Sequence, residues 1–205
     1  MIRITAQNLS KNFNRRTVFG GISFQLTSPS SLAITGKNGS GKSTLSKIIA
    51  GVLSSSSGML DYSCDGKSVP QKEIQHTLGF VSPYINLYDE FTAYENLSIL
   101  SRIRSTSCDA TYAKELLSLV NLWHRRDDVT ATFSSGMKQR LKYVFALLHH
   151  PEILILDEPT SNLDAEGVQF VGQMIERQKR HGILIVATND AHEAQWCSQE
   201  IHVGM

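Results

Sequence analysis

Hydrophobic positions near the start of the chain alternate with polar ones, as they do in strands that bury one face. Ile2, Ile4 and Ala6 form one such series, and residues 22, 24 and 26 form another. Segments 32–35, 153–156 and 183–187 are instead short and continuously apolar. Such runs are typical of strands that are buried on both faces of a parallel sheet.

Helical spacing occupies the intervals between these apolar runs. Leu45, Ile48 and Ile49 recur with a helical period before Gly51, and apolar stripes recur from residue 91 to 148. Asp164 can cap a helix that ends near His181. Buried strands that alternate with helices predict an α/β fold with a mainly parallel sheet covered on both faces.

Composition and charge narrow the function classes. The chain has 205 residues, of which 41% are hydrophobic and 19% charged, as expected of a packed globular domain. Lys and Arg number 20 against 19 Asp and Glu, so we expect no nucleic-acid partner. The three cysteines are scattered, which indicates reduced thiols rather than disulfides or a zinc site. No apolar run is long enough to cross a bilayer, so we expect a soluble, cytoplasmic protein that reaches a membrane only through a partner.

Residues 36–43 match the phosphate-loop pattern GxxxxGK[ST], between a predicted strand and a predicted helix. Glycines allow backbone N–H groups to surround phosphate oxygens, and the following helix directs its positive end at them. Lys42 would place its charge beside the β- and γ-phosphates, and Ser43 would offer its hydroxyl to Mg²⁺. The residues predicted to bind the nucleotide here are Gly36, Asn38, Gly39, Ser40, Gly41, Lys42, Ser43 and Thr44.

A second acidic motif follows the apolar run 153–156. Asp157 stands at the exposed tip of that predicted strand and can hold Mg²⁺ directly or through water. Glu158 is then placed to polarise an attacking water as a general base. Together with the phosphate loop, the pair predicts an ATPase site with Lys42 and Glu158 as catalytic residues.

Two further segments resemble the motifs of ABC (ATP-binding cassette) ATPases. Residues 133–141, FSSGMKQRL, resemble the family signature, and 156–164, LDEPTSNLD, resemble its Walker B motif and D-loop. The resemblance implies one domain over 1–205, in which a phosphate-loop core with a small antiparallel sheet (1–84 and 141–205) carries an inserted helical subdomain (85–140). It also implies ATP and Mg²⁺ as cofactors.

The same resemblance implies a head-to-tail dimer with a second copy or a related ATPase subunit. Ser134 and Gly136 match signature positions that contact the γ-phosphate bound to the other subunit, and Phe13 matches an aromatic residue that stacks on adenine. Phe13 is read equally well as an ordinary packing residue. Lys138, Arg140 and Lys142, which follow the signature, are expected on a solvated helix face.

Two positions depart from the family pattern. Pro83 stands where the family has a glutamine that offers an oxygen to the metal and water, and Asn189 stands at the place of the switch histidine. Asn189 can donate a hydrogen bond to a γ-phosphate but cannot carry charge. We therefore expect slow hydrolysis, and faster hydrolysis in Asn189→His if Asn189 is simply a weaker donor. In the alternative, Asn189 is fitted to its surroundings, with Asn86 or a backbone carbonyl standing in for the glutamine, and Asn189→His brings no gain.

Several identities within the family stay open. A transporter ATPase on the inner face of the cell membrane is the first hypothesis, with a resemblance to the haem exporter of cytochrome c maturation. Its integral membrane subunit would dock near Tyr84, Tyr88 and Phe91. The alternatives are a soluble ATPase, for example of iron–sulfur assembly, and a regulator that binds nucleotide and scarcely hydrolyses it.

Overall fold

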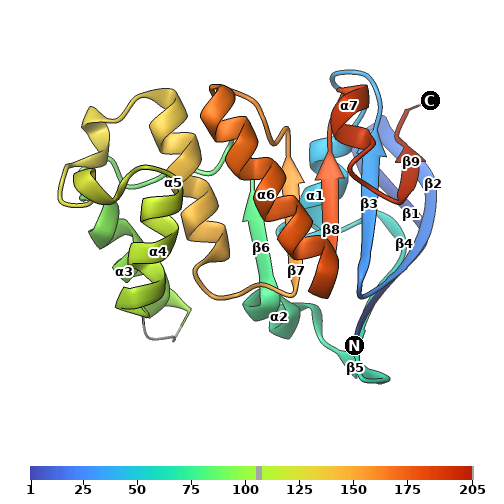
Figure 1. Ribbon diagram of the computed structural model, residues 1–205. Coiled ribbons are helices and arrows are strands. Elements are labelled where there is room, and N and C mark those ends of the chain that lie inside the picture. Colours follow the sequence, from blue (N-terminus) through green and yellow to red (C-terminus); the bar gives the residue numbers. More distant parts are fainter. Residues whose placement is uncertain (105–107, 205) are drawn as a thin grey trace.

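A computed structural model describes residues 1–104 and 108–204 and has a parallel sheet at its centre (Figure 1). The order of its five strands is β6-β7-β8-β3-β9, and every neighbouring pair is parallel. Their bounds are Leu78–Val81 for β6, Ile153–Asp157 for β7, Ile183–Ala187 for β8, Ser30–Thr35 for β3 and Gln199–His202 for β9. The predicted α/β class and buried strands are confirmed.

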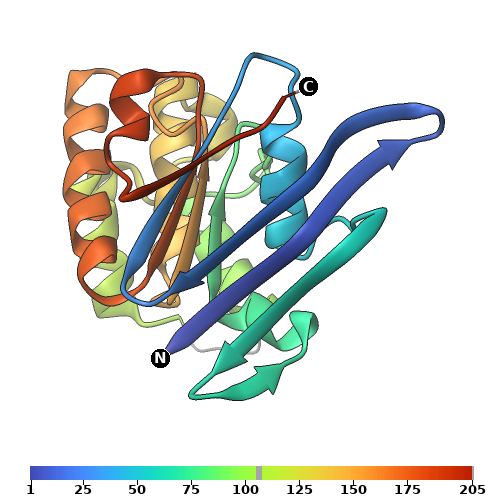
Figure 2. The same cartoon turned by 90° about the vertical axis from the view of Figure 1, so that its right-hand side faces the viewer.

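A second, antiparallel sheet packs on one side of the molecule (Figure 2). Its strand order is β2-β1-β4-β5, with bounds Arg16–Thr27, Ile2–Phe13, Ser57–Cys64 and Lys67–Val69. Helix α1 (Lys42–Ile49) lies between the two sheets, and its buried face joins both of them in one hydrophobic cluster. The phosphate loop at the start of α1 is therefore anchored from two sides.

Side chains of the central strands divide the interior into two clusters. Ile153 and Ile155 of β7 face the cluster that contains α1, whereas Leu154 and Leu156 face the cluster beneath the other helices. This division follows from the alternation of side chains along a strand. All five residues of β7 are buried, which explains why the sequence of this strand is apolar until Asp157.

Helices α3–α6 cover the opposite face of the parallel sheet and extend beyond its β6 edge, whereas Ile74 of the short helix α2 packs in the cluster that contains α1 (Figure 1). The bounds of these helices and of α7 are Gln71–Ile74 for α2, Ala93–Ile103 for α3, Ala110–Leu119 for α4, Ser135–Leu147 for α5, Ala165–His181 for α6 and Ala191–Ala194 for α7. Short 3₁₀ segments lie at Gln75–Thr77, Trp123–Arg125 and Thr130–Thr132. As predicted, Asp164 caps α6 through the N–H of Gly167, and the helix ends at Gly182. None of the helices in the described part of the chain combines the length and apolar character that crossing a bilayer requires.

The predicted solvated face after the signature is wrong for Arg140. This side chain is buried and donates hydrogen bonds to Asp164 and to the carbonyl of Val120. Because a buried guanidinium needs a partner, the pairing with Asp164 fixes α5 against the start of α6. Lys142 is also partly covered and donates to the carbonyl of Pro83, 3.1 Å away.

Candidate active site

The phosphate loop follows β3 and adopts a backbone that requires glycine at two positions. Gly36 has φ 146°, and a Cβ there would lie 2.2 Å from the carbonyl oxygen of Val203. Gly41 has φ 108° and caps α1 with no side chain, and a Cβ there would lie 2.6 Å from Val18. Without side chains at these points, the first N–H groups of α1 stay open to a bound anion.

Lys42 is the first residue of α1 and its side chain is buried under the loop. Its ammonium donates to the carbonyls of Gly36 (2.9 Å) and Lys37 (3.2 Å) and lies 3.9 Å from Glu158. A buried ammonium held by carbonyls keeps its charge in place beside the loop. The geometry agrees with the role of a phosphate-facing cation.

Asp157 is fully buried at the end of β7, and each of its carboxylate oxygens accepts one hydroxyl. Ser43 donates to Oδ1 at 2.9 Å and Ser82, just after β6, donates to Oδ2 at 3.2 Å. Burial raises the pKa of Asp157, and the two hydroxyls act against that rise. Sequence reasoning identified Asp157 and Ser43 and missed Ser82.

Glu158 turns sharply out of the sheet immediately after Asp157. Its φ of 52° lies in the left-handed region, and its backbone N–H bonds to the carbonyl of Ala187 in β8. Burial raises the pKa of Glu158, and the nearby charge of Lys42 lowers it in part. This rise brings the pKa of the Glu158 carboxyl closer to the value that suits a general base at neutral pH.

These residues surround one pocket of about 320 Å³. It is lined by Val18, Asn38, Gly39, Gly41, Lys42, Ser43, Thr44, Pro83, Tyr84, Asp157 and Glu158. The pocket lies at the carboxyl ends of β3, β6 and β7, where ligands of open parallel sheets bind. The Oγ of Ser40, within the phosphate loop, is buried without a partner, which suits a loop that completes its hydrogen bonds with a ligand.

Phe13 lies beside a wider pocket that adjoins the phosphate loop. Its side chain is 49% exposed at the end of β1, and Lys11 lies 4.8 Å from the ring centroid. The pocket of about 990 Å³ is also lined by residues 37–40 of the loop and by His202. An exposed ring next to the phosphate loop suits stacking on a base better than core packing.

Asn189 follows β8 and contacts the phosphate loop directly. Its side-chain amide donates to Oδ1 of Asn38 at 2.8 Å. The backbone before it is held by Thr188, whose buried hydroxyl donates to the buried carboxylate of Glu193, and Glu193 also accepts from Thr160. The sequence predicted no role for Glu193.

The signature residues lie away from this pocket. Ser134 caps α5 by accepting the N–H of Met137 and is exposed, and Gly136 lies in the first turn of the same helix. A Cβ on Gly136 would lie 3.1 Å from the carbonyl of Asn162. Neither residue lines the phosphate pocket of its own chain.

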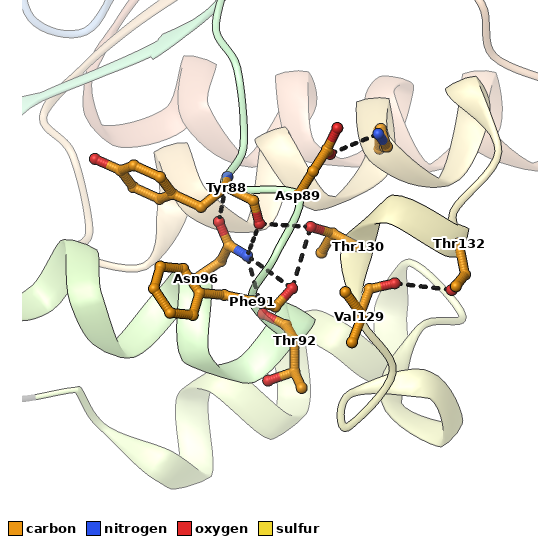
Figure 3. Close-up of polar contacts among 9 residues, drawn as sticks. Tyr88, Asp89, Phe91, Thr92, Asn96, Val129, Thr130 and Thr132 are labelled. Atoms are coloured by element: carbon orange, nitrogen blue, oxygen red, sulfur yellow. Dashed lines mark hydrogen bonds and ion pairs between the residues drawn. The ribbon is translucent and has the colours of Figure 1, made fainter.

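The aromatic loop, residues 88–92, is exposed but held from beneath (Figure 3). Buried Asn96 accepts the N–H of Tyr88 and donates to the carbonyls of Tyr88 and Thr92, each within 3.0 Å. Buried Thr130 donates to the carbonyls of Tyr88 and Phe91. These contacts fix the loop backbone while the rings of Tyr88 and Phe91, 51% and 39% exposed, face outward.

The oxygen donors around Asp157 fit a hard divalent cation. Among the described residues, no group of three or more His, Cys, Asp or Glu side chains could hold a metal by itself. The hydroxyls of Ser43 and Ser82 meet the carboxylate of Asp157, and of these three residues Ser43 and Asp157 line the phosphate pocket. Mg²⁺ characteristically combines such a small protein set with nucleotide phosphates and water.

Comparison with known proteins identifies relatives over nearly the whole chain. A family model described as ABC transporter matches residues 19–161. The linearmycin resistance ATP-binding protein of Bacillus subtilis is 34% identical, over 91% of this chain and 60% of its own length. The lipoprotein-releasing system ATP-binding protein of Idiomarina loihiensis is 34% identical, over 94% of this chain and 90% of its own length. A lantibiotic transport ATP-binding protein of Streptococcus pyogenes is 32% identical, over 89% of this chain and 78% of that protein.

Solved structures agree on the fold. An ATP-binding subunit of an ABC transporter superimposes with a TM-score of 0.85 at 25% identity, covering 98% of this chain and 85% of that one. A dimeric ATP-binding cassette bound to ADP and phosphate gives a TM-score of 0.85 at 22% identity, covering 98% and 94%. The second likeness bears on the fold alone.

Proposed function

Because this chain belongs to the ABC transporter family of ATP-binding proteins, we propose that it is the ATPase subunit that powers such a transporter. The observation that carries the proposal is the meeting of Lys42, Asp157 and Glu158 at one pocket beside the phosphate loop. A cation for phosphate, a carboxylate for metal and a carboxylate for water are the groups that phosphoryl transfer to water requires.

Each group has a defined task in the proposed reaction. Lys42 and the N–H groups of α1 bind the phosphates, and Ser43 and Asp157 hold Mg²⁺, which neutralises phosphate charge when bound. Glu158 accepts a proton from the attacking water. Asn189 donates a hydrogen bond to the transferring phosphate. It does so through the side-chain amide that donates to Asn38 in this structure.

ATP binding and hydrolysis by Lys42→Ala test the site directly. Removing the buried ammonium should weaken ATP binding by about 100-fold, measured by calorimetry, and abolish phosphate release. Lys72→Ala, at an exposed position of α2, removes the same charge elsewhere and should leave both unchanged. Equal ATP affinity in the two variants would reject the assignment.

We also propose that two chains pair head to tail, which would supply the signature to the pocket. Ser134 lies at the N-terminus of α5, where its backbone N–H groups can bind phosphate, yet it does not line its own pocket. In this proposal 1–84 and 141–205 form the nucleotide-binding core and 85–140 the helical subdomain. The boundary at 140/141 falls within α5, so this helix would be shared between the nucleotide-binding core and the helical subdomain.

The membrane subunit is proposed to dock on the aromatic loop and on a groove lined in part by residues 84 and 85, which precede the loop in the chain. The groove of about 530 Å³ is lined by Val52, Phe80 and Phe145, among others, and by Tyr84, which also lines the phosphate pocket. Tyr84 is 69% exposed and packs against Lys47. Exposed rings on a fixed backbone are suited to binding another surface, and Tyr84 would connect that surface to the nucleotide. Such docking would place the chain on the cytoplasmic face of the membrane.

If a polytopic membrane protein is encoded beside this chain, co-purification with it tests the docking surface. Tyr88→Ala and Phe91→Ala should each weaken the complex, by about tenfold for a contact at its centre, while ATP binding stays unchanged. Met59→Ala removes an equally exposed apolar side chain from the antiparallel sheet and is the control. Undiminished binding by both loop variants would reject this surface.

The narrower proposal of a haem exporter rests on resemblance in sequence alone. The relatives above are named for linearmycin, lantibiotics and lipoproteins, and haem is not among these names. Haem export assays on cells that lack this chain test it. Normal cytochrome c maturation in those cells would reject it and leave the ATPase proposal intact.

A further inference from the structure

Ser82 occupies a place beside Asp157 that mirrors that of Ser43. Strands β6 and β7 are parallel, with Val81 paired to Leu156, so the next residues, Ser82 and Asp157, lie side by side. Ser82 is 1% exposed and donates to one carboxylate oxygen, while Ser43 donates to the other. Two hydroxyl oxygens, from α1 and from the end of β6, therefore flank one buried carboxylate.

The structure disfavours both substitutes that the sequence offered for the missing glutamine. Pro83 carries no side-chain oxygen, and its carbonyl accepts the ammonium of Lys142 at 3.1 Å. The positive charge of Lys142 at this carbonyl would repel a Mg²⁺ ion bound to the same oxygen. Asn86 is exposed, and neither Asn86 nor Ser82 is a lining residue of the phosphate pocket, but Ser82 hydrogen-bonds directly to Asp157, which does line it.

We propose that the hydroxyl of Ser82 replaces that glutamine as an oxygen ligand of the active-site Mg²⁺, an inference that rests on the proposed ATPase function. A hydroxyl that donates its proton to Asp157 keeps its lone pairs available to a metal. Asp157 fixes the orientation of the hydroxyl, as partners of metal ligands generally do. The oxygen donor is thus displaced by one residue, from position 83 to position 82, and from a long side chain on a loop to a short one on the end of a strand.

Mn²⁺ binding in the presence of ATP tests this inference without relying on turnover. The proteins carry Glu158→Gln to suppress hydrolysis, and free Mn²⁺ is measured by electron paramagnetic resonance. Ser82→Ala should weaken Mn²⁺ binding by about tenfold and leave ATP binding in EDTA unchanged. Ser46→Ala is the matched control, because Ser46 is a fully buried serine of α1 whose hydroxyl has no partner.

A near-isosteric variant distinguishes a ligand from a residue that only supports Asp157. Ser82→Cys offers a thiolate, which prefers soft metals, so its affinity for Cd²⁺ relative to Mn²⁺ should rise by about tenfold over the parent protein. An unchanged ratio, or Mn²⁺ affinity in Ser82→Ala equal to that of Ser46→Ala, would overturn the inference alone. Failure of the parent protein to bind ATP even in EDTA would overturn the proposed function as well.

Discussion

The phosphate pocket lies at the carboxyl ends of buried strands, whereas the aromatic loop lies on the outside of the helices beyond the β6 edge. In the pocket, Lys42 and Asp157 are buried and each makes hydrogen bonds to two other groups. In the loop, the burial is reversed: Asn96 and Thr130 are buried beneath, and the rings of Tyr88 and Phe91 are exposed.

This difference indicates which functions one chain can perform alone. The pocket already brings together Lys42, the proposed metal ligands and the proposed base, so nucleotide binding should depend on this chain. The aromatic loop and Ser134 are fixed in position but face solvent, as the proposed binding of a membrane subunit and of a second chain would require. The variants below test this division.

Glu158→Gln should have the largest effect and confine it to the pocket. Loss of the base should slow hydrolysis by about 1,000-fold while the amide keeps the shape and ATP still binds. If a second chain completes the site, an ATP-dependent dimer should then accumulate in size-exclusion chromatography with light scattering. A monomer at high protein and ATP concentrations would contradict the head-to-tail dimer.

The pH profile of the parent protein sharpens this test. Burial raises the pKa of Glu158, and only the deprotonated carboxylate can accept a proton. Hydrolysis should therefore decline with falling pH from a higher pH than an ordinary glutamate would give. The residual activity of Glu158→Gln should lack this decline, and an identical decline in both proteins would assign it to another group.

Asn96→Ala should separate the loop from the pocket. It removes the amide that holds the backbone of Tyr88 and Thr92, and leaves their partly buried carbonyls with fewer donors. We expect a loss of about 2 kcal/mol in the free energy of unfolding, measured by urea denaturation, together with weaker membrane-subunit binding. Asn86→Ala, at an exposed asparagine of the same segment, is the control. An equal loss of stability in both variants would contradict the supporting role of Asn96.

The residues that meet at the phosphate pocket could be proposed from the sequence because they lie within or next to strong local patterns. Glycines at 36 and 41 are required by the backbone, and the apolar run 153–156 positions Asp157 and Glu158 wherever it folds as a buried strand. Asp164 and Gly182 likewise mark the ends of α6 through local hydrogen bonds. Local physics therefore determined these elements.

Ser82, Glu193 and Arg140 could not be predicted because their roles depend on pairing between distant segments. Ser82 meets Asp157 only through the register of β6 with β7. Glu193 is buried because the chain after β8 packs against Thr160. Arg140 has a charged side chain on a helix beside the signature, and its burial depends on Asp164, which lies far along the chain. Helical periodicity carries no information about such partners.

Asn189→His tests whether a histidine donor at position 189 speeds hydrolysis in this pocket. One well-placed donor in a preorganised site is worth up to about 100-fold in rate. Asn189 already contacts the phosphate loop by a hydrogen bond to Asn38. We therefore expect Asn189→His to give a smaller gain, about tenfold in single-turnover hydrolysis at saturating ATP, with unchanged ATP affinity. A slower variant would mean that the contact between Asn189 and Asn38 is itself required.

The smallest expected effect concerns the contact that joins the aromatic loop to the signature helix. Lys138, one turn into α5, lies 2.6 Å from Asp89 of the loop, and both side chains are partly exposed. As a surface ion pair it should contribute only about 0.5 kcal/mol to stability in a double-mutant cycle of Asp89→Ala and Lys138→Ala.

The position of the Lys138–Asp89 ion pair nevertheless links the proposed docking surface with Ser134. If docking is transmitted along this contact, each single variant should reduce the stimulation of ATP hydrolysis by the membrane subunit, by about twofold for a coupling of that size, and leave hydrolysis by the isolated chain unchanged. Lys179→Ala, which breaks the exposed pair with Glu176 on α6, is the control. Full stimulation in both Asp89→Ala and Lys138→Ala would show that the loop and the signature respond to the partner independently, and the route would then run through Tyr84 and the phosphate pocket.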